Sequence, residues 1–394
     1  MRENAYLQWL SASTDTIYWH DGAIDADVQG AIRNGAVGMT TNPFLVAETL
    51  TKDHAFWEER TETKEEWQKA VQQPDPDEKA EALTRLVAGH FEGVFAPFAK
   101  RKGTEAESGE KPGIDAGGYV CAQLNPYRSG DAAYCISQMK RFASWSDRLM
   151  LKIPATCAGL QAMEEAAALG FPVTSTCTLT VSQALYAGEA LERGRKRAEA
   201  AGRSCGLTAV VFQPGRLDEY LRDTAQDAGQ YEDDTAQDAG RDKDDMARGA
   251  GQYAGAPSGD AAGGMEPVLE SDIQQAGLAC VKKLYRIFEE RGWHSPLLIA
   301  GFRNLRQITE LAGGKLILTI PGAWADAIPE DTPKEGRIGR EVEPEVVERL
   351  LQLPEFARAY REDGLSPKEF ITYGAYNRTI DQLQNDGWGI MRKL

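Results

Sequence analysis

The stretch Arg148-Leu-Met-Leu-Lys152-Ile-Pro-Ala-Thr156 decides both the fold and the chemistry that this sequence predicts. A short apolar run that ends in turn-forming residues is typical of a strand buried on both faces. Its one lysine is unusual there, because burial of an unpaired ammonium group is costly and favours the neutral amine. A neutral lysine is a nucleophile that forms Schiff bases with carbonyl compounds. The competing interpretation is a lysine just beyond the strand, with its ammonium group in water.

The same unit, an apolar run followed by a helical pattern, recurs along the chain. Strands are predicted at 17–19, 37–39, 119–124, 149–153, 173–176, 207–212, 297–302 and 316–320. Eight strands that alternate with helices close most simply into a (β/α)8 TIM barrel. An open doubly wound sheet is the alternative, but no G-x-G-x-x-G motif follows the first strand. Two long helices, 56–72 and 77–100, are predicted between the second and third strands.

The whole chain, residues 1–394, is predicted to form one barrel domain with extra N- and C-terminal helices. Residues 101–118 are polar and glycine-rich, which indicates a surface loop. Residues 223–265 form an acidic, low-complexity insert in which the heptapeptide Asp-Thr-Ala-Gln-Asp-Ala-Gly occurs twice. Such a segment has too few apolar residues to fold, so disorder is expected. The C-terminal extension, 340–394, is helical, and fits either a lid over the active site or a contact within a homo-oligomer.

Composition limits the partners and the compartment. The net charge of −16 argues against nucleic acid or an anionic membrane surface as a partner. The six cysteines show no C-x-x-C pairing, which favours reduced thiols. The four histidines show no ligand spacing, so neither a metal nor another cofactor is expected. No apolar leader or membrane-spanning run is present, and a cytoplasmic protein is therefore predicted.

Polar side chains end nearly every predicted strand. In a barrel of this kind the active groups lie where the strands end and the βα-loops begin. These positions are, in chain order, Asp21, Asn42, Gln123, Lys152, Thr176, Arg216 and Arg303. Each has an ordinary structural interpretation when taken alone, such as a turn residue or a surface charge. Together at one mouth they indicate a catalytic site.

The chemistry that this set suits is cleavage and formation of a carbon–carbon bond through a Schiff base. Lys152 attacks a ketose carbonyl, and Asp21 moves protons at the departing hydroxyl. Gln123 and Thr176 are expected to hold a water that serves formation and dehydration of the carbinolamine. Asn42 is expected to hydrogen-bond the bound three-carbon unit. Arg216 and Arg303 fit a sugar phosphate, because the guanidinium fork matches phosphate oxygens.

Three motifs resemble the transaldolase family: Gly38-Met-Thr-Thr-Asn-Pro43, Leu151-Lys-Ile-Pro154 and Ala300-Gly-Phe-Arg-Asn304. The resemblance implies a transaldolase-type barrel in which Lys152 is the Schiff-base lysine. It also implies that Asp21 is the acid/base, that Asn42 and Thr176 are active-site partners, and that Arg216 and Arg303 bind phosphate. Thr40, within the first motif, is assigned to substrate binding. The family's usual reaction transfers a dihydroxyacetone unit from fructose 6-phosphate or sedoheptulose 7-phosphate to an aldose phosphate.

The sequence departs from typical transaldolases in three places. Gln123 stands where they have glutamate and resembles the fructose-6-phosphate aldolase branch of the family. Their strand-six serine has no clear counterpart in Val210-Val-Phe-Gln213, and the strand-five run Thr174–Thr178 is unusually rich in hydroxyl groups. Transfer of dihydroxyacetone is the leading hypothesis, with aldol cleavage or a transaldolase for another acidic ketose, such as a sulfonated sugar, as alternatives. A non-catalytic sugar-phosphate-binding barrel is the alternative from a different class.

Overall fold

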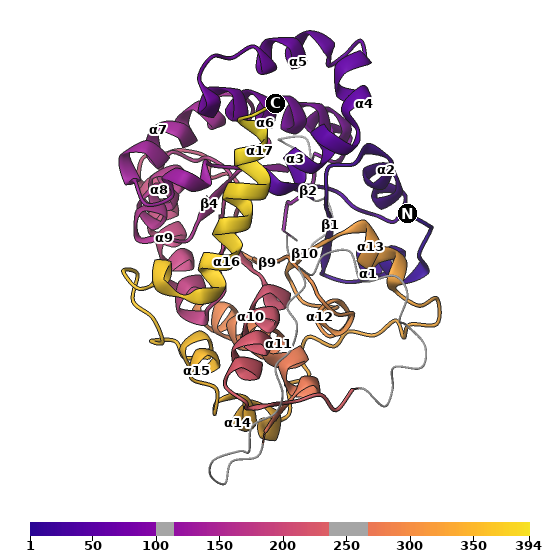
Figure 1. Ribbon diagram of the computed structural model, residues 1–394, viewed down its shortest axis with the longest axis vertical. Helices are drawn as coiled ribbons and strands as arrows, with labels where there is room; N and C mark the ends of the chain where they lie inside the picture. Colours follow the sequence, from indigo (N-terminus) through magenta and orange to yellow (C-terminus); the bar gives the residue numbers. More distant parts are fainter. Residues whose placement is uncertain (100–113, 236–266) are drawn as a thin grey trace.

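A computed structural model describes residues 1–99, 114–235 and 267–394. Its centre is a closed, all-parallel barrel with the strand order β1-β10-β9-β6-β5-β4-β3-β2, which confirms the predicted (β/α)8 barrel (Figure 1). The barrel strands are β1 Ile17–Asp21, β2 Met39–Thr40, β3 Val120–Gln123, β4 Leu149–Pro154, β5 Val173–Thr176, β6 Thr208–Phe212, β9 Leu297–Ile299 and β10 Ile317–Ile320.

A helix follows each strand and packs on the outside of the barrel (Figure 1). The helices directly after the strands are α2 Asp25–Arg33, α3 Pro43–Lys52, α7 Ala132–Ala143, α8 Cys157–Ala168, α9 Val181–Ala200, α10 Pro214–Asp227, α12 Arg306–Thr309 and α13 Gly322–Ala327. The additional helices are α1 Ala5–Ser13, α4 His54–Glu59, α5 Lys64–Val71, α6 Pro76–Phe95, α11 Glu270–Arg291, α14 Pro344–Leu350, α15 Pro354–Tyr360, α16 Gly374–Gln382 and α17 Gly389–Met391. Short turns of helix are η1 Ala96–Phe98, η2 Pro126–Arg128, η3 Phe370–Thr372 and the π-helical η4 Leu383–Trp388.

Two predicted segments differ from the structure by more than a shift of their ends. The single helix predicted over 56–72 is two helices, because the chain is extended at Arg60 and the Thr63 hydroxyl donates a hydrogen bond to the Trp57 carbonyl (3.0 Å). The beginning of the predicted insert is ordered: residues 223–227 complete α10, and β7 Tyr231–Glu232 pairs with β8 Val268–Leu269. The remainder of the insert, from residue 236, and residues 101–113 of the predicted loop lie outside the described residues.

Strand alternation separates two cores. Inside the barrel, a small apolar layer is formed by Trp19, Cys121, Met150, Ala209, Val211, Leu298, Ala300 and Ile317. On β4, Leu149, Leu151 and Ile153 belong to the larger core between the barrel and its helices, whereas Met150 faces inward. Lys152 is two residues beyond Met150 and therefore faces the barrel interior, above the apolar layer.

Gly38, the first residue of the Gly38–Pro43 motif, is required by the packing of that layer. A Cβ at Gly38 would lie 2.7 Å from Nε1 of Trp19, whose indole donates to the Ala116 carbonyl at 3.0 Å. At the other end of the motif, the Asn42 side chain caps α3 and Pro43 occupies its first turn. The motif therefore folds as the close approach of β2 to Trp19 followed by a capped helix.

Candidate active site

The carboxyl ends of the strands carry a polar layer directly above the apolar one. Strand register pairs Asp21 with Thr40, Gln123 with Lys152, and Lys152 with Thr174. Paired residues on neighbouring parallel strands point to the same side of the sheet. The interior at this end of the barrel is therefore lined by a carboxyl, an amine, an amide and hydroxyl groups.

Lys152 is only 3% exposed, and its Nζ donates a hydrogen bond to the Thr41 carbonyl at 3.2 Å. The structure thus places this lysine inside the barrel, and the interpretation of a side chain that reaches bulk water is wrong. The Thr41 hydroxyl in turn donates to the Cys121 carbonyl at 2.6 Å, which ties the β2 end to β3. This bond fixes the carbonyl that holds Lys152.

Asp21 and Thr40 lie on neighbouring strands and contact each other. The Thr40 hydroxyl donates to Oδ1 of Asp21 at 2.7 Å, and it also lies 2.7 Å from the Thr319 hydroxyl on β10. Burial raises the pKa of the Asp21 carboxyl, while the positive charge of Lys152 and the bond from Thr40 act in the opposite direction. Asp21 is therefore a buried carboxyl within electrostatic reach of the lysine amine.

Two glutamines, one buried and one half-buried, have buried polar atoms without a hydrogen-bond partner among the described residues. They are Gln123, at both side-chain atoms, and Gln213, at Oε1. Leaving such groups unpaired is costly, so they mark a place where a substrate or an ordered water fits. Gln123 was among the predicted site residues. Gln213 was not, although it ends strand six in the same way as the other residues that were selected.

Asn42 and Thr176 have defined structural environments. Oδ1 of Asn42 accepts from the Leu45 backbone N–H at 3.0 Å, which leaves its second lone pair and the Nδ2 group for a substrate. Thr176 is 1% exposed and pairs in register with Pro154. The next residue, Cys177, has a positive φ of 52°, and burial raises the pKa of its thiol to about 12. The thiol is thus held neutral at the end of β5.

Arg216 and Arg303 approach each other across the ends of β6 and β9. Two glycines leave space for the arginine side chains. A Cβ at Gly215 would lie 2.5 Å from Cγ of Arg303, and a Cβ at Gly301 would lie 3.5 Å from Cγ of Arg216. Burial and then the charge of Arg303 lower the pKa of Arg216. The two guanidinium groups therefore lie within electrostatic reach of each other.

The C-terminal segment crosses the mouth of the barrel (Figure 1). The Arg216 guanidinium group donates a hydrogen bond to the Gln382 side chain. The backbone carbonyl of Gln384 accepts a hydrogen bond from the hydroxyl of Tyr127, in the loop after β3, at 3.0 Å. At its far end, the Trp388 indole donates to Asp77 of α6 at 2.7 Å. These contacts hold the C-terminal segment against Arg216, the loop after β3 and α6.

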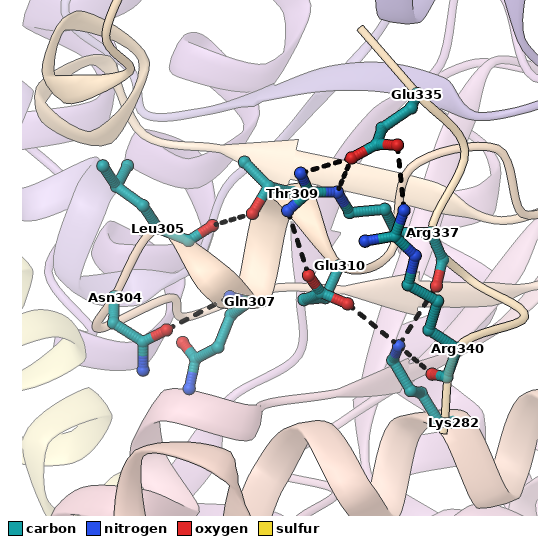
Figure 2. Close-up of polar contacts among 9 residues, drawn as sticks. All are labelled: Lys282, Asn304, Leu305, Gln307, Thr309, Glu310, Glu335, Arg337 and Arg340. Carbon is teal, nitrogen blue, oxygen red and sulfur yellow. Dashed lines mark hydrogen bonds and ion pairs between the residues drawn. The ribbon is translucent and has the colours of Figure 1, made fainter. Parts of the chain in front are cut away.

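A buried network supports Arg303 from behind. Asp218, 1% exposed, accepts hydrogen bonds from the Gly277 backbone N–H at 2.7 Å and from the Gln307 side chain at 2.6 Å. Oε1 of Gln307 accepts from the backbone N–H of Arg303 at 2.7 Å, and the Gln307 backbone is capped by Asn304 (Figure 2). Asp218 thus positions Arg303 through Gln307.

This network predicts a pH dependence of stability. Burial raises the pKa of Asp218 from 3.8 to about 8. The folded state therefore holds a proton that the unfolded state has lost, and the stability contributed by Asp218 falls as the pH rises from about 4 to about 8. His20, whose pKa burial lowers from 6.5 to about 4, acts in the opposite direction but only below about pH 6.5. We expect the urea concentration at the unfolding midpoint to decrease as the pH is raised from 6.5 to 8, and to decrease less in Asp218→Asn than in the unchanged protein. Equal slopes in both proteins would contradict this assignment.

Among residues 1–99, 114–235 and 267–394, no group of three or more His, Cys, Asp or Glu side chains could hold a metal ion. No described helix is long and apolar enough to cross a membrane.

The fold and the polar layer define the class of protein: a (β/α)8 barrel whose candidate site lies at the carboxyl ends of its strands, where barrel enzymes bind their substrates. The transaldolase/fructose-6-phosphate aldolase family matches residues 18–366. The chain belongs to this family.

Individual relatives are more distant. A transaldolase from Neisseria meningitidis serogroup A is 27% identical over 200 residues, which cover 50% of this chain and 52% of that protein. Transaldolase 1 from Streptomyces avermitilis is 28% identical over 197 residues, 49% and 48% of the two chains. A transaldolase from Mycobacterium marinum is 25% identical over 239 residues, 58% and 60% of the two chains. The chain thus spans about half the length of the curated relatives it matches.

Proposed function

We propose that the protein is a transaldolase that moves a dihydroxyacetone unit from a ketose phosphate to an aldose phosphate through a Schiff base on Lys152. The observation that carries the proposal is the burial of Lys152 in the polar layer, beside a carboxyl whose pKa responds to its charge. The neutral amine of a lysine at this position can attack the carbonyl of a ketose. Family membership and the relatives named transaldolase support the same reaction.

The reaction follows from these groups. The Lys152 amine adds to the ketose carbonyl, and loss of water from the carbinolamine leaves an iminium. The iminium accepts the electron pair of the bond between the third and fourth carbons, while Asp21 takes the proton of the hydroxyl on the fourth carbon. The aldose phosphate leaves, and the enamine on Lys152 attacks an acceptor aldehyde, which regains the proton from Asp21. Arg216 and Arg303 hold the phosphate, and Gln123 and Thr176 hold the water.

Gln123 supports a second candidate, a lyase that resembles fructose-6-phosphate aldolase. The amide of Gln123 is buried with both polar atoms unpaired, and it cannot take up a proton at neutral pH. Gln123 can therefore hold a water by hydrogen bonds but cannot exchange a proton with it. Compared with a glutamate at this position, this changes the balance between attack of the enamine on an aldehyde and release of free dihydroxyacetone to water.

Borohydride trapping tests the proposal. The protein is incubated with fructose 6-phosphate and then reduced, with and without erythrose 4-phosphate, and its peptides are analysed by mass spectrometry. We expect a reduced three-carbon adduct on the Lys152 peptide that the aldose depletes as sedoheptulose 7-phosphate appears. If the amount of adduct is the same with and without the aldose, and free dihydroxyacetone accumulates, the result would instead support the lyase. Absence of an adduct with any acidic ketose would favour the non-catalytic barrel.

A further inference from the structure

The arginine pair of the candidate site is held by a carboxylate of the protein itself. Glu219 lies on α10, one turn after Arg216. Its Oε1 accepts a hydrogen bond from Nε of Arg303, and its Oε2 lies 3.9 Å from Nη1 of Arg216. Glu219 therefore bridges the two guanidinium groups that the proposed function assigns to the substrate's acidic group.

The other contacts of Arg216 leave one of its donor atoms unpaired. Nε of Arg216 is buried and has no hydrogen-bond partner among the described residues. Nη2 of Arg216 donates to the side-chain amide of Gln382, which is neutral. The Glu219 side chain is 38% exposed and those of Arg216 and Arg303 are 27% and 31% exposed, so all three side chains are accessible to solvent.

The charges decide which anion fits. Arg216, Arg303 and Glu219 together carry a net charge of +1. The Asp21 carboxyl also interacts with both arginines, but burial raises its pKa and favours its neutral form. A singly charged anion neutralises that net charge. A phosphate ester carries about −1.5 to −2 at pH 7, so it meets the Glu219 carboxylate as a like charge and must repel or displace it.

We propose that Glu219 is a specificity-determining residue: it is the resident counter-ion of the arginine pair and sets the charge preference of the anion subsite. Glu219 weakens the binding of doubly charged groups more than that of singly charged ones. The inference rests on the proposed function only in placing the substrate's acidic group at Arg216 and Arg303. It adds that the ketose is selected partly by the charge state of that group.

Direct binding tests the proposal without turnover. Methyl phosphate and methanesulfonate, which differ in charge but little in size, are titrated calorimetrically at pH 7.5 into the unchanged protein and into Glu219→Gln. Glutamine keeps an oxygen that accepts from Arg303 and removes only the charge. We expect Glu219→Gln to bind methyl phosphate about tenfold more tightly, or about 1.4 kcal/mol, and to bind methanesulfonate with a smaller gain.

Asp223→Asn provides the matched control. Asp223 lies one turn further along α10, and its ion pair is with the exposed Arg378 (2.6 Å) rather than with the arginine pair. It makes the same change in net charge and is expected to leave both affinities unchanged.

Unchanged or weaker phosphate binding by Glu219→Gln would overturn the proposal, because Glu219 would then only position Arg303. Failure of the unchanged protein to bind either anion would overturn it as well. Neither result depends on the Lys152 adduct, so the trapping experiment tests the proposed reaction separately.

Discussion

Replacement of Lys152 with methionine is expected to abolish the borohydride-trapped adduct and to lower kcat by more than about 10⁴-fold. Methionine has nearly the same length and fills the space of a side chain that is only 3% exposed. It removes the Lys152 amine, whose charge acts on Asp21. The fold should be retained, because the main partner that is lost is one backbone carbonyl, that of Thr41. Mass spectrometry of the trapped peptides and steady-state kinetics measure the two effects.

Lys282→Met is the control that separates chemistry from burial. Lys282 on α11 is also 3% exposed, but it lies outside the barrel. Its Nζ donates to Glu310 at 3.3 Å and to the carbonyls of Arg337 and Arg340 (Figure 2). Its loss removes hydrogen bonds to these partly buried acceptors, at about 1 kcal/mol of stability each. We expect Lys282→Met to unfold at lower urea concentration and to keep the adduct. Full turnover by Lys152→Met would exclude the Schiff-base mechanism.

Asp21→Asn is expected to reduce kcat by about 10²- to 10⁴-fold, the usual contribution of a general acid or base, with a much smaller effect on KM. Asparagine keeps an oxygen that accepts from the Thr40 hydroxyl, so the geometry at the ends of β1 and β2 is preserved. What it removes is the ability to exchange a proton with the hydroxyl on the fourth carbon of the ketose. Steady-state kinetics with fructose 6-phosphate and erythrose 4-phosphate measure this loss.

The same substitution has a second, opposite consequence for stability. Because burial raises the pKa of Asp21, ionisation of this group disfavours the folded state, and its contribution to stability falls as the pH rises through the folded pKa. Asp21→Asn should therefore be at least as stable as the unchanged protein at pH 8. Asp25→Asn is the control, since Asp25 lies near β1 but faces His90 at 3.5 Å. It should leave kcat unchanged. Activity retained by Asp21→Asn would assign the proton transfer to another group.

Much of the barrel and of its polar layer could be predicted from the sequence for a simple reason. Strands buried on both faces must be apolar, and a polar residue that ends one is conspicuous. Asp21, Gln123 and Lys152 were selected in this way, and the structure brings them to one end of the barrel interior. The helix over 56–72 was wrong because the break at Arg60 depends on a hydrogen bond from Thr63, which periodicity does not reveal. The beginning of the insert is ordered because β7 pairs with a strand that follows it in sequence.

By itself, the sequence determined the alternation of strands and helices and the polar residue at the end of nearly every strand, because these depend on local periodicity. The tertiary structure decided that the Lys152 side chain is buried and does not reach water. Only the tertiary structure decided which groups surround the two arginines. Glu219 and Gln382 are 163 residues apart and meet at Arg216 because α10 and the C-terminal helix pack at the same mouth. The orphaned amides of Gln123 and Gln213 likewise became visible only after barrel closure excluded their other partners. Contacts between distant elements depend on the closed barrel, and local sequence patterns do not encode them.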